Sequence, residues 1–113
     1  SKLFVLAMKA GAILGGGNEK QINDMEKWAL AFGHAFQIYD DILDEIATLE
    51  ELGKTPGKDA NAHKATYTSL FGLEKAKCEV KRLCDQCCDI LNSNGYDSLI
   101  LRGILSDITE RVC

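Results

Sequence analysis

Blocks of apolar residues separated by short polar or glycine-rich breaks run along this chain and predict helices. Residues 3–14 (LFVLAMKAGAIL) are apolar on nearly every side, which a helix tolerates only where other helices bury it all round. The GGGN run at residues 15–18 should end that helix, because glycine readily adopts the left-handed conformation of a helix C-cap. We therefore expect a second helix to begin near Asn18 or Asn23.

One long helix is predicted over residues 21–46, which lack proline, contain a single glycine and are rich in good helix formers. Its middle, residues 29–38, has only His34 and Gln37 as polar side chains, so it too should be buried nearly all round. Two such helices have more apolar surface than they can cover for each other. We infer a larger all-helical bundle, completed by another subunit or by sequence that precedes Ser1.

The rest of the chain predicts a loop and two amphipathic helices. Residues 48–66 contain the only proline and three lysines without an apolar period, which is typical of a loop. A helix is expected over residues 69–91, where apolar positions recur at spacings of three and four: Leu70, Leu73, Ala76, Val80, Leu83, Cys87 and Leu91. After a stop at residues 92–95, a last helix over residues 98–112 should present one apolar side, made of Leu101, Ile104, Leu105, Ile108 and Val112.

Composition narrows the class of protein. A chain of 113 residues that is 46% hydrophobic has room for one domain and is too apolar to be disordered. The net charge of −4, with lysines and arginines spread along the chain, argues against nucleic acid or an anionic membrane as the main partner. The opening apolar run contains Lys9 and falls short of the about 20 residues that a membrane span needs, and it lacks the features of a secretory leader. Five cysteines, an odd number, indicate a reducing compartment such as the cytoplasm.

Candidate chemistry begins on the long helix, where Gln37, Asp40, Asp41 and Asp44 follow one another at i, i+3, i+4 and i+7 and so share one stripe. Three carboxylates on one stripe repel one another, and a divalent cation would relieve that repulsion. Oxygen ligands without cysteine or histidine favour Mg²⁺, which is often shared between carboxylates and substrate phosphates. The alternative is an incidental, solvated acidic face. The carboxylates directly follow an apolar stretch and lie near the helix end, where acidic side chains oppose the macrodipole. Because this placement costs stability, it favours a functional role.

Lys54, Lys58 and Lys64 follow in the predicted loop, close to glycine or small residues that let the backbone approach a ligand. Metal-binding carboxylates combined with lysines are what binding a diphosphate, and stabilising it as a leaving group, requires. A lysine-rich surface loop is the alternative.

Residues 35–77 closely resemble the second aspartate-rich region of trans-isoprenyl diphosphate synthases, particularly the geranylgeranyl and farnesyl diphosphate synthase group. The motifs are Phe36-Gln37, DDILD at residues 40–44, LGK at 52–54, GKD at 57–59 and Lys-x-Thr-Tyr at 64–67, in that order. Residues 1–17 are similar to the family segment that follows its Lys-Thr motif. The resemblance extends to about residue 80, and more loosely to both C-terminal helices.

This resemblance implies an antiparallel helical bundle of the isoprenoid synthase type, which joins an allylic diphosphate to isopentenyl diphosphate with Mg²⁺ as cofactor. It assigns Asp40, Asp41 and Asp44 to metal binding, and makes Asp40 and Lys54 the catalytic residues. Lys54 and Lys64 would bind diphosphate, Phe36 and Gln37 would line the isopentenyl side, and Lys58 and Asp59 are weaker candidates. The family also suggests a homodimer in the cytoplasm, or in the plastid of a plant.

The family's first aspartate-rich motif, basic isopentenyl pocket and Lys-Thr lysine would all precede Ser1. We therefore expect residues 1–113 to be the C-terminal part of one synthase domain, without turnover alone. A competing interpretation is a noncatalytic small subunit, because Cys84 and Cys88 form a CxxxC pattern similar to one used for subunit contact in heteromeric plant synthases. Packing is the simpler role for Cys84, Cys87 and Cys88, since no second cysteine pair accompanies them. We expect His34 in the core or an interface and His63 in a loop.

Overall fold

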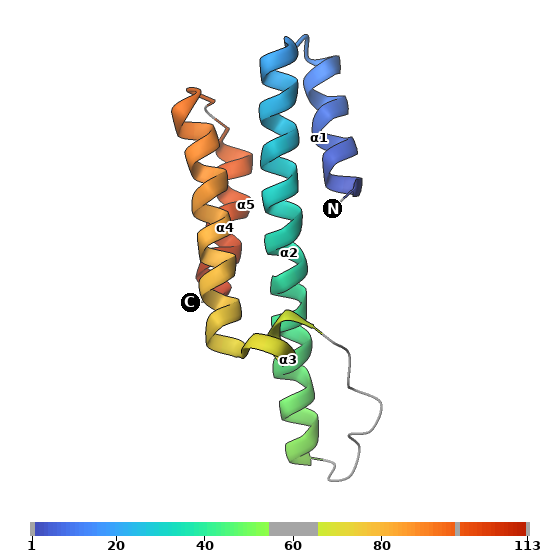
Figure 1. Cartoon of the computed structure of the whole chain (residues 1–113), viewed down its shortest axis with the longest axis vertical. Coiled ribbons are helices and arrows are strands. Elements are labelled where there is room, and N and C mark those ends of the chain that lie inside the picture. The colour runs from blue at the N-terminus through green and yellow to red at the C-terminus, as the bar shows by residue number, and fades with distance from the viewer. Residues whose placement is uncertain (1, 55–65, 97, 113) are drawn as a thin grey trace.

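The computed structural model describes residues 2–54, 66–96 and 98–112, and these residues form five helices. They are α1 (Lys2–Leu14), α2 (Glu19–Lys54), α3 (Tyr67–Phe71), α4 (Leu73–Ser93) and α5 (Leu99–Val112). No strand occurs within these ranges, so the all-α prediction is confirmed. Figure 1 shows α2 as the long central helix, with α1 along one side of it and α4 and α5 along the other.

The turn between α1 and α2 forms as the sequence predicts. Gly16 has a φ of +80°, the left-handed conformation that ends α1, and the Gly17 amide donates to the Ala12 carbonyl at 2.8 Å. Asn18 then caps α2, because its side chain accepts from the Gln21 amide at 2.9 Å while the Gln21 side chain accepts from the Asn18 amide at 2.9 Å. This reciprocal pair fixes the start of α2 and makes α1 and α2 an antiparallel hairpin.

The core lies where α2 meets α4 and α5. From α2 it takes Trp28, Phe32, Ala35, Ile38 and Ile42, and from α4 it takes Ala76, Val80, Leu83, Cys84, Cys87 and Leu91, all buried. On α5, Leu105, Ile108 and Val112 are buried as the predicted apolar side requires, while Leu101 is half-buried and Ile104 is exposed. The predicted stripe of α4 is thus confirmed from Ala76 onward.

Two predicted boundaries are wrong. The loop expected to begin at residue 48 does not, because α2 continues to Lys54 through a stretch dominated by leucine and glutamate, which are strong helix formers. The single helix expected over residues 69–91 is interrupted at Gly72, whose φ of +91° separates α3 from α4. Leu70 therefore falls on α3 and is 67% exposed rather than part of the buried stripe.

The burial expected for α1 is also wrong, because no side chain described in this helix is buried. The helix packs along α2 through one face, which includes Phe4 and Met8, and its other face is exposed at Leu3, Leu6, Ile13 and Leu14. The middle of α2 is mixed rather than buried all round, since Leu30, His34, Phe36 and Gln37 are exposed there. Apolar side chains thus remain uncovered on both α1 and α2.

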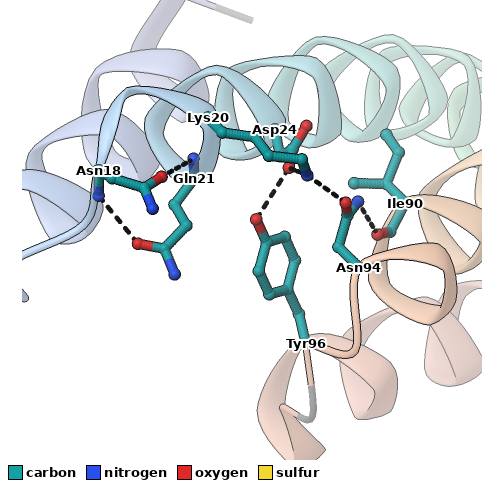
Figure 2. A network of polar contacts seen from close by, with 7 residues as sticks. All are labelled: Asn18, Lys20, Gln21, Asp24, Ile90, Asn94 and Tyr96. Carbon is teal, nitrogen blue, oxygen red and sulfur yellow. Dashed lines mark hydrogen bonds and ion pairs between the residues drawn. The ribbon is translucent and has the colours of Figure 1, made fainter.

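A polar network joins the beginning of α2 to the turn between α4 and α5 (Figure 2). The Asp24 carboxylate accepts from the Lys20 ammonium at 2.7 Å and from the Tyr96 hydroxyl at 2.8 Å. Lys20 also donates to the Asn94 side chain, which in turn donates to the Ile90 carbonyl at 2.7 Å. The network ties segments about 70 residues apart in the sequence to the same end of the bundle.

This network predicts a specific pH dependence of stability. The hydrogen bonds from Lys20 and Tyr96 hold the pKa of Asp24 below its ordinary value, so the stabilisation is complete above about pH 4 and is lost as the pH falls further. We expect the melting temperature of wild-type protein to fall more steeply between pH 5 and pH 2 than that of Asp24→Asn. Asp107→Asn, which alters an exposed pair with Arg111 within α5, should keep the wild-type slope. Equal slopes for wild type and Asp24→Asn would contradict the role of the network.

Candidate functional site

The predicted acidic stripe lies on an outward face of α2. Gln37, Asp40 and Asp44 are exposed and Asp41 is partly exposed. The residues between them, Ile38, Tyr39 and Ile42, are buried in the core, so packing fixes which way this part of α2 faces. A ligand can therefore reach the carboxylates from one direction, because the core occupies the other.

The carboxylates do not converge on one point. Within the described ranges, no group of three or more histidine, cysteine, aspartate or glutamate side chains is close enough together to hold a metal ion. Asp40, Asp41 and Asp44 are spread along the helix, with their oxygen atoms open to an approaching ligand. This donor set does not suit a closed protein cage. It suits Mg²⁺ that keeps several waters and takes the remaining oxygen atoms from a bound phosphate compound.

An aromatic column lies beside the stripe and joins α1 to α2. The Phe4 ring contacts the rings of Phe32 and Phe36, with centroids 5.2 Å and 5.4 Å away and interplanar angles of 86° and 61°. Phe36 also lies 6.4 Å from the ring of Tyr39, and Phe32 stacks on Trp28 at 4.9 Å. Phe36, predicted as a substrate-binding residue, is 41% exposed and precedes Asp40 by one helical turn.

The predicted basic residues are placed only in part. Lys54 is the last residue of α2, while Lys58, Asp59, His63 and Lys64 lie outside the described residues. The described chain resumes at Thr66, whose side chain accepts from the Ser69 amide at 3.1 Å in a capping box that begins α3. This cap fixes the chain two residues after Lys64, and α3 packs against both α2 and α4.

Two of the α4 cysteines serve packing, while Cys78 on the same helix is exposed. Cys84 and Cys87 are buried, and the Cys87 thiol donates to the Trp28 carbonyl at 3.6 Å. Burial raises the pKa of Cys87 to about 12 and raises the pKa of Cys84 as well, so both stay protonated thiols at neutral pH. Cys84, half of the CxxxC pattern, is therefore buried in the core, while Cys88, the other half, is partly exposed. His34 is exposed, so it does not belong to the core.

A groove of about 510 Å³ lies on the uncovered side of the α1 and α2 hairpin. Its lining is mostly apolar but includes two lysines, and consists of Lys2, Val5, Leu6, Lys9, Ala10, Ile13 and Leu30. None of the described helices combines the length and apolarity needed to cross a membrane.

The residues of this site lie within a segment that matches a known protein family. The family model described as polyprenyl synthetase matches residues 1–107, which include the acidic stripe, the aromatic column and the groove. This chain belongs to the polyprenyl synthetase family. The resemblance inferred from the DDILD segment is thereby confirmed.

Relatives within this family are named for prenyl transfer. The chain is 53% identical over 81 residues to the heterodimeric geranylgeranyl pyrophosphate synthase large subunit 2 of Arabidopsis thaliana, which covers 72% of the chain and 22% of that protein. It is 47% identical over 84 residues to a dimethylallyltranstransferase of Fischerella ambigua, covering 74% of the chain and 24% of the relative. The chain is 40% identical over 104 residues to the chloroplastic geranylgeranyl pyrophosphate synthase 7 of Arabidopsis thaliana. The match covers 92% of the chain and 29% of that relative. The chain thus spans about a quarter of the length of these relatives.

The sequence prediction of this site missed one element. Phe4 belongs to a helix that we assigned only to burial, yet its ring contacts the candidate substrate residue Phe36. The signal was available, because the short turn at residues 15–18 pairs the two helices in an antiparallel register that brings position 4 opposite positions 32 and 36.

Proposed function

We propose that this chain is the C-terminal part of a synthase domain that joins an allylic diphosphate to isopentenyl diphosphate, head to tail. The observation that carries the proposal is the outward carboxylate stripe of α2 within a chain whose residues 1–107 match the polyprenyl synthetase family. In this reaction diphosphate leaves the allylic substrate, the double bond of isopentenyl diphosphate attacks the resulting allylic carbocation, and a proton is lost. The chemistry required is binding and neutralising a diphosphate beside an apolar surface.

Each candidate residue has a role in this proposal. Asp40, Asp41 and Asp44 would hold Mg²⁺, and the chemistry that the bound ion supplies is neutralisation of the diphosphate charge. Lys54 and Lys64 would bind diphosphate oxygen atoms directly and stabilise the leaving group. Phe36 and Gln37, exposed on α2 just before Asp40, would line the side that receives isopentenyl diphosphate.

The uncovered apolar surface supports the proposal that the domain is larger than these residues. Leu3, Leu6, Ile13 and Leu14 of α1 are each more than half exposed, and so many large apolar side chains exposed on one helix are typical of a helix that other helices cover. The rest of the synthase domain is the proposed cover, in keeping with relatives of which the matched residues make up 22% and 29%. A homodimer, located in the cytoplasm or in a plant plastid, completes the proposal.

The direct test is a condensation assay on the full-length protein that contains this chain. With radiolabelled isopentenyl diphosphate, an allylic diphosphate and Mg²⁺, we expect a longer, labelled prenyl diphosphate to form. EDTA should abolish the product, and residues 1–113 expressed alone should form none. Absence of product with dimethylallyl, geranyl and farnesyl diphosphates would refute the proposed activity.

Joint binding of Mg²⁺ and pyrophosphate gives a second test, which separates a functional stripe from an incidental one. Ligands present together at about 100 times their dissociation constant should stabilise the folded protein by about 2.7 kcal/mol, whereas either alone should have a much smaller effect. The measurement is the shift in melting temperature of the full-length protein. Asp44→Asn should reduce the joint shift, and Asp85→Asn, an exposed acid on α4, should not. A joint shift equal to the sum of the separate shifts would indicate an incidental acidic face.

A further inference from the structure

The ring of Phe36 is held by contacts on several sides but remains partly open. Its neighbours are Phe32 at 6.1 Å and Tyr39 at 6.4 Å on the same helix, and Phe4 at 5.4 Å on α1. Even with these three contacts Phe36 is 41% exposed, and Asp40, also exposed, follows it one turn later on α2. The ring is therefore both restrained and available to a ligand.

Phe4 is the neighbour that decides the position of this ring. Phe32 and Tyr39 sit on the same helix as Phe36, so they restrain its ring only from above and below along α2. Phe4 approaches from the other helix and contacts both Phe32 and Phe36 edge to face, the geometry that aromatic rings prefer. Removing the Phe4 ring would open space on the α1 side, into which the Phe36 ring can rotate.

We infer that Phe4 is a positioning residue for the isopentenyl diphosphate site, acting through the ring of Phe36. This inference rests on the proposed function, because it takes Phe36 as a wall of that site. Phe4 has no carboxylate, lysine or other phosphate-binding group, so its effect is on the placement of the apolar part of the substrate. Its loss should weaken substrate binding more than the chemical step.

A double-mutant cycle in the full-length protein tests the coupling. Phe4→Leu and Phe36→Leu are each expected to raise KM for isopentenyl diphosphate about three- to tenfold, with kcat within about twofold, which corresponds to the usual strength of an aromatic pair. In the Phe36→Leu background, Phe4→Leu should raise KM no further. Phe4→Tyr keeps the ring and should keep KM within about twofold of wild type. Phe71→Leu, the same exchange in the Tyr67 and Phe71 pair of α3, is the matched control and should leave KM unchanged.

The possible outcomes are distinct. A purely structural role for Phe4 would lower the active fraction, and so the apparent kcat, without changing KM. An unchanged KM in Phe4→Leu, or an equal rise in KM with and without Phe36→Leu, would overturn the inference while leaving the synthase activity intact. If wild-type protein forms no product, the proposed function fails and this inference fails with it. Phe4→Met keeps much of the side-chain volume without a ring and replaces Phe4→Leu if that variant does not fold.

Discussion

Replacing Asp40 with alanine in the full-length protein is expected to lower kcat/KM by roughly 10²–10³, the usual loss when one group that stabilises transition-state charge is removed. Asp40 is exposed on the outward stripe of α2 and stands one turn after Phe36, so it is the carboxylate nearest the proposed isopentenyl side. Its loss would leave the departing diphosphate less well neutralised. The measurement is the steady-state rate of labelled isopentenyl diphosphate incorporation over a range of Mg²⁺ concentrations.

Asp85→Ala provides the control for this variant. Asp85 is an exposed acid in the middle of α4, outside the candidate site. Its replacement changes the net charge by the same amount as Asp40→Ala, but should leave kcat/KM within about twofold of wild type. Circular dichroism should show equal helix content for both variants. A normal rate in Asp40→Ala at every Mg²⁺ concentration would remove Asp40 from the reaction and return the stripe to a solvated face.

The largest effect on stability is expected for Trp28→Ala, at about 3–5 kcal/mol. Trp28 is 2% exposed and stacks on Phe32 with ring centroids 4.9 Å apart. Its backbone carbonyl accepts a hydrogen bond from the Cys87 thiol. Alanine would leave a cavity in the core where α2 meets α4. Urea unfolding of the full-length protein, followed by circular dichroism, measures the change.

Trp28→Phe separates the packing of this side chain from its polar atom. Among the atoms that the structure describes, the indole Nε1 is buried without a hydrogen-bond partner, and a buried unpaired donor costs about 1–3 kcal/mol. Phenylalanine keeps a ring against Phe32 and removes that donor, so its cost should be less than half that of Trp28→Ala. Leu70→Ala, at a position 67% exposed, should change stability by no more than about 0.5 kcal/mol. Equal losses in Trp28→Ala and Leu70→Ala would contradict the assigned core.

Local signals predicted the helices well where apolar spacing and breakers agreed. The glycine run after Leu14 and the apolar positions from Ala76 to Leu91 gave the first turn and the buried face of α4. The break at Gly72 was missed, because a single glycine inside a periodic segment is compatible with either a continuous helix or a cap. The extension of α2 to Lys54 was missed because charged helix formers carry no apolar period.

Burial on α1 was the part of the fold that sequence could not settle. An apolar composition on every side shows that a helix must be covered by other helices, but it does not show which residues cover it. Similarly, the spacing of Asp40, Asp41 and Asp44 fixed their common stripe, whereas their lack of convergence depends on the side chains' positions in space. The contact between Phe4 and Phe36 needed the register of two helices, which only the combined turn and helix lengths provide.

The glycine turn between α1 and α2 sets the position of α1 along α2. A Cβ at Gly17 would lie 2.8 Å from the Ala12 carbonyl oxygen, so the backbone itself excludes any larger residue there without a local shift. The tight closure fixes how far α1 is offset along α2 over about 20 Å, the length of thirteen helical residues. One residue added within α1, between Phe4 and this turn, would rotate the Phe4 ring by about 100° around the helix axis and away from α2. The geometry beside Asp40 is thus decided at the opposite end of the hairpin, where no ligand needs to reach.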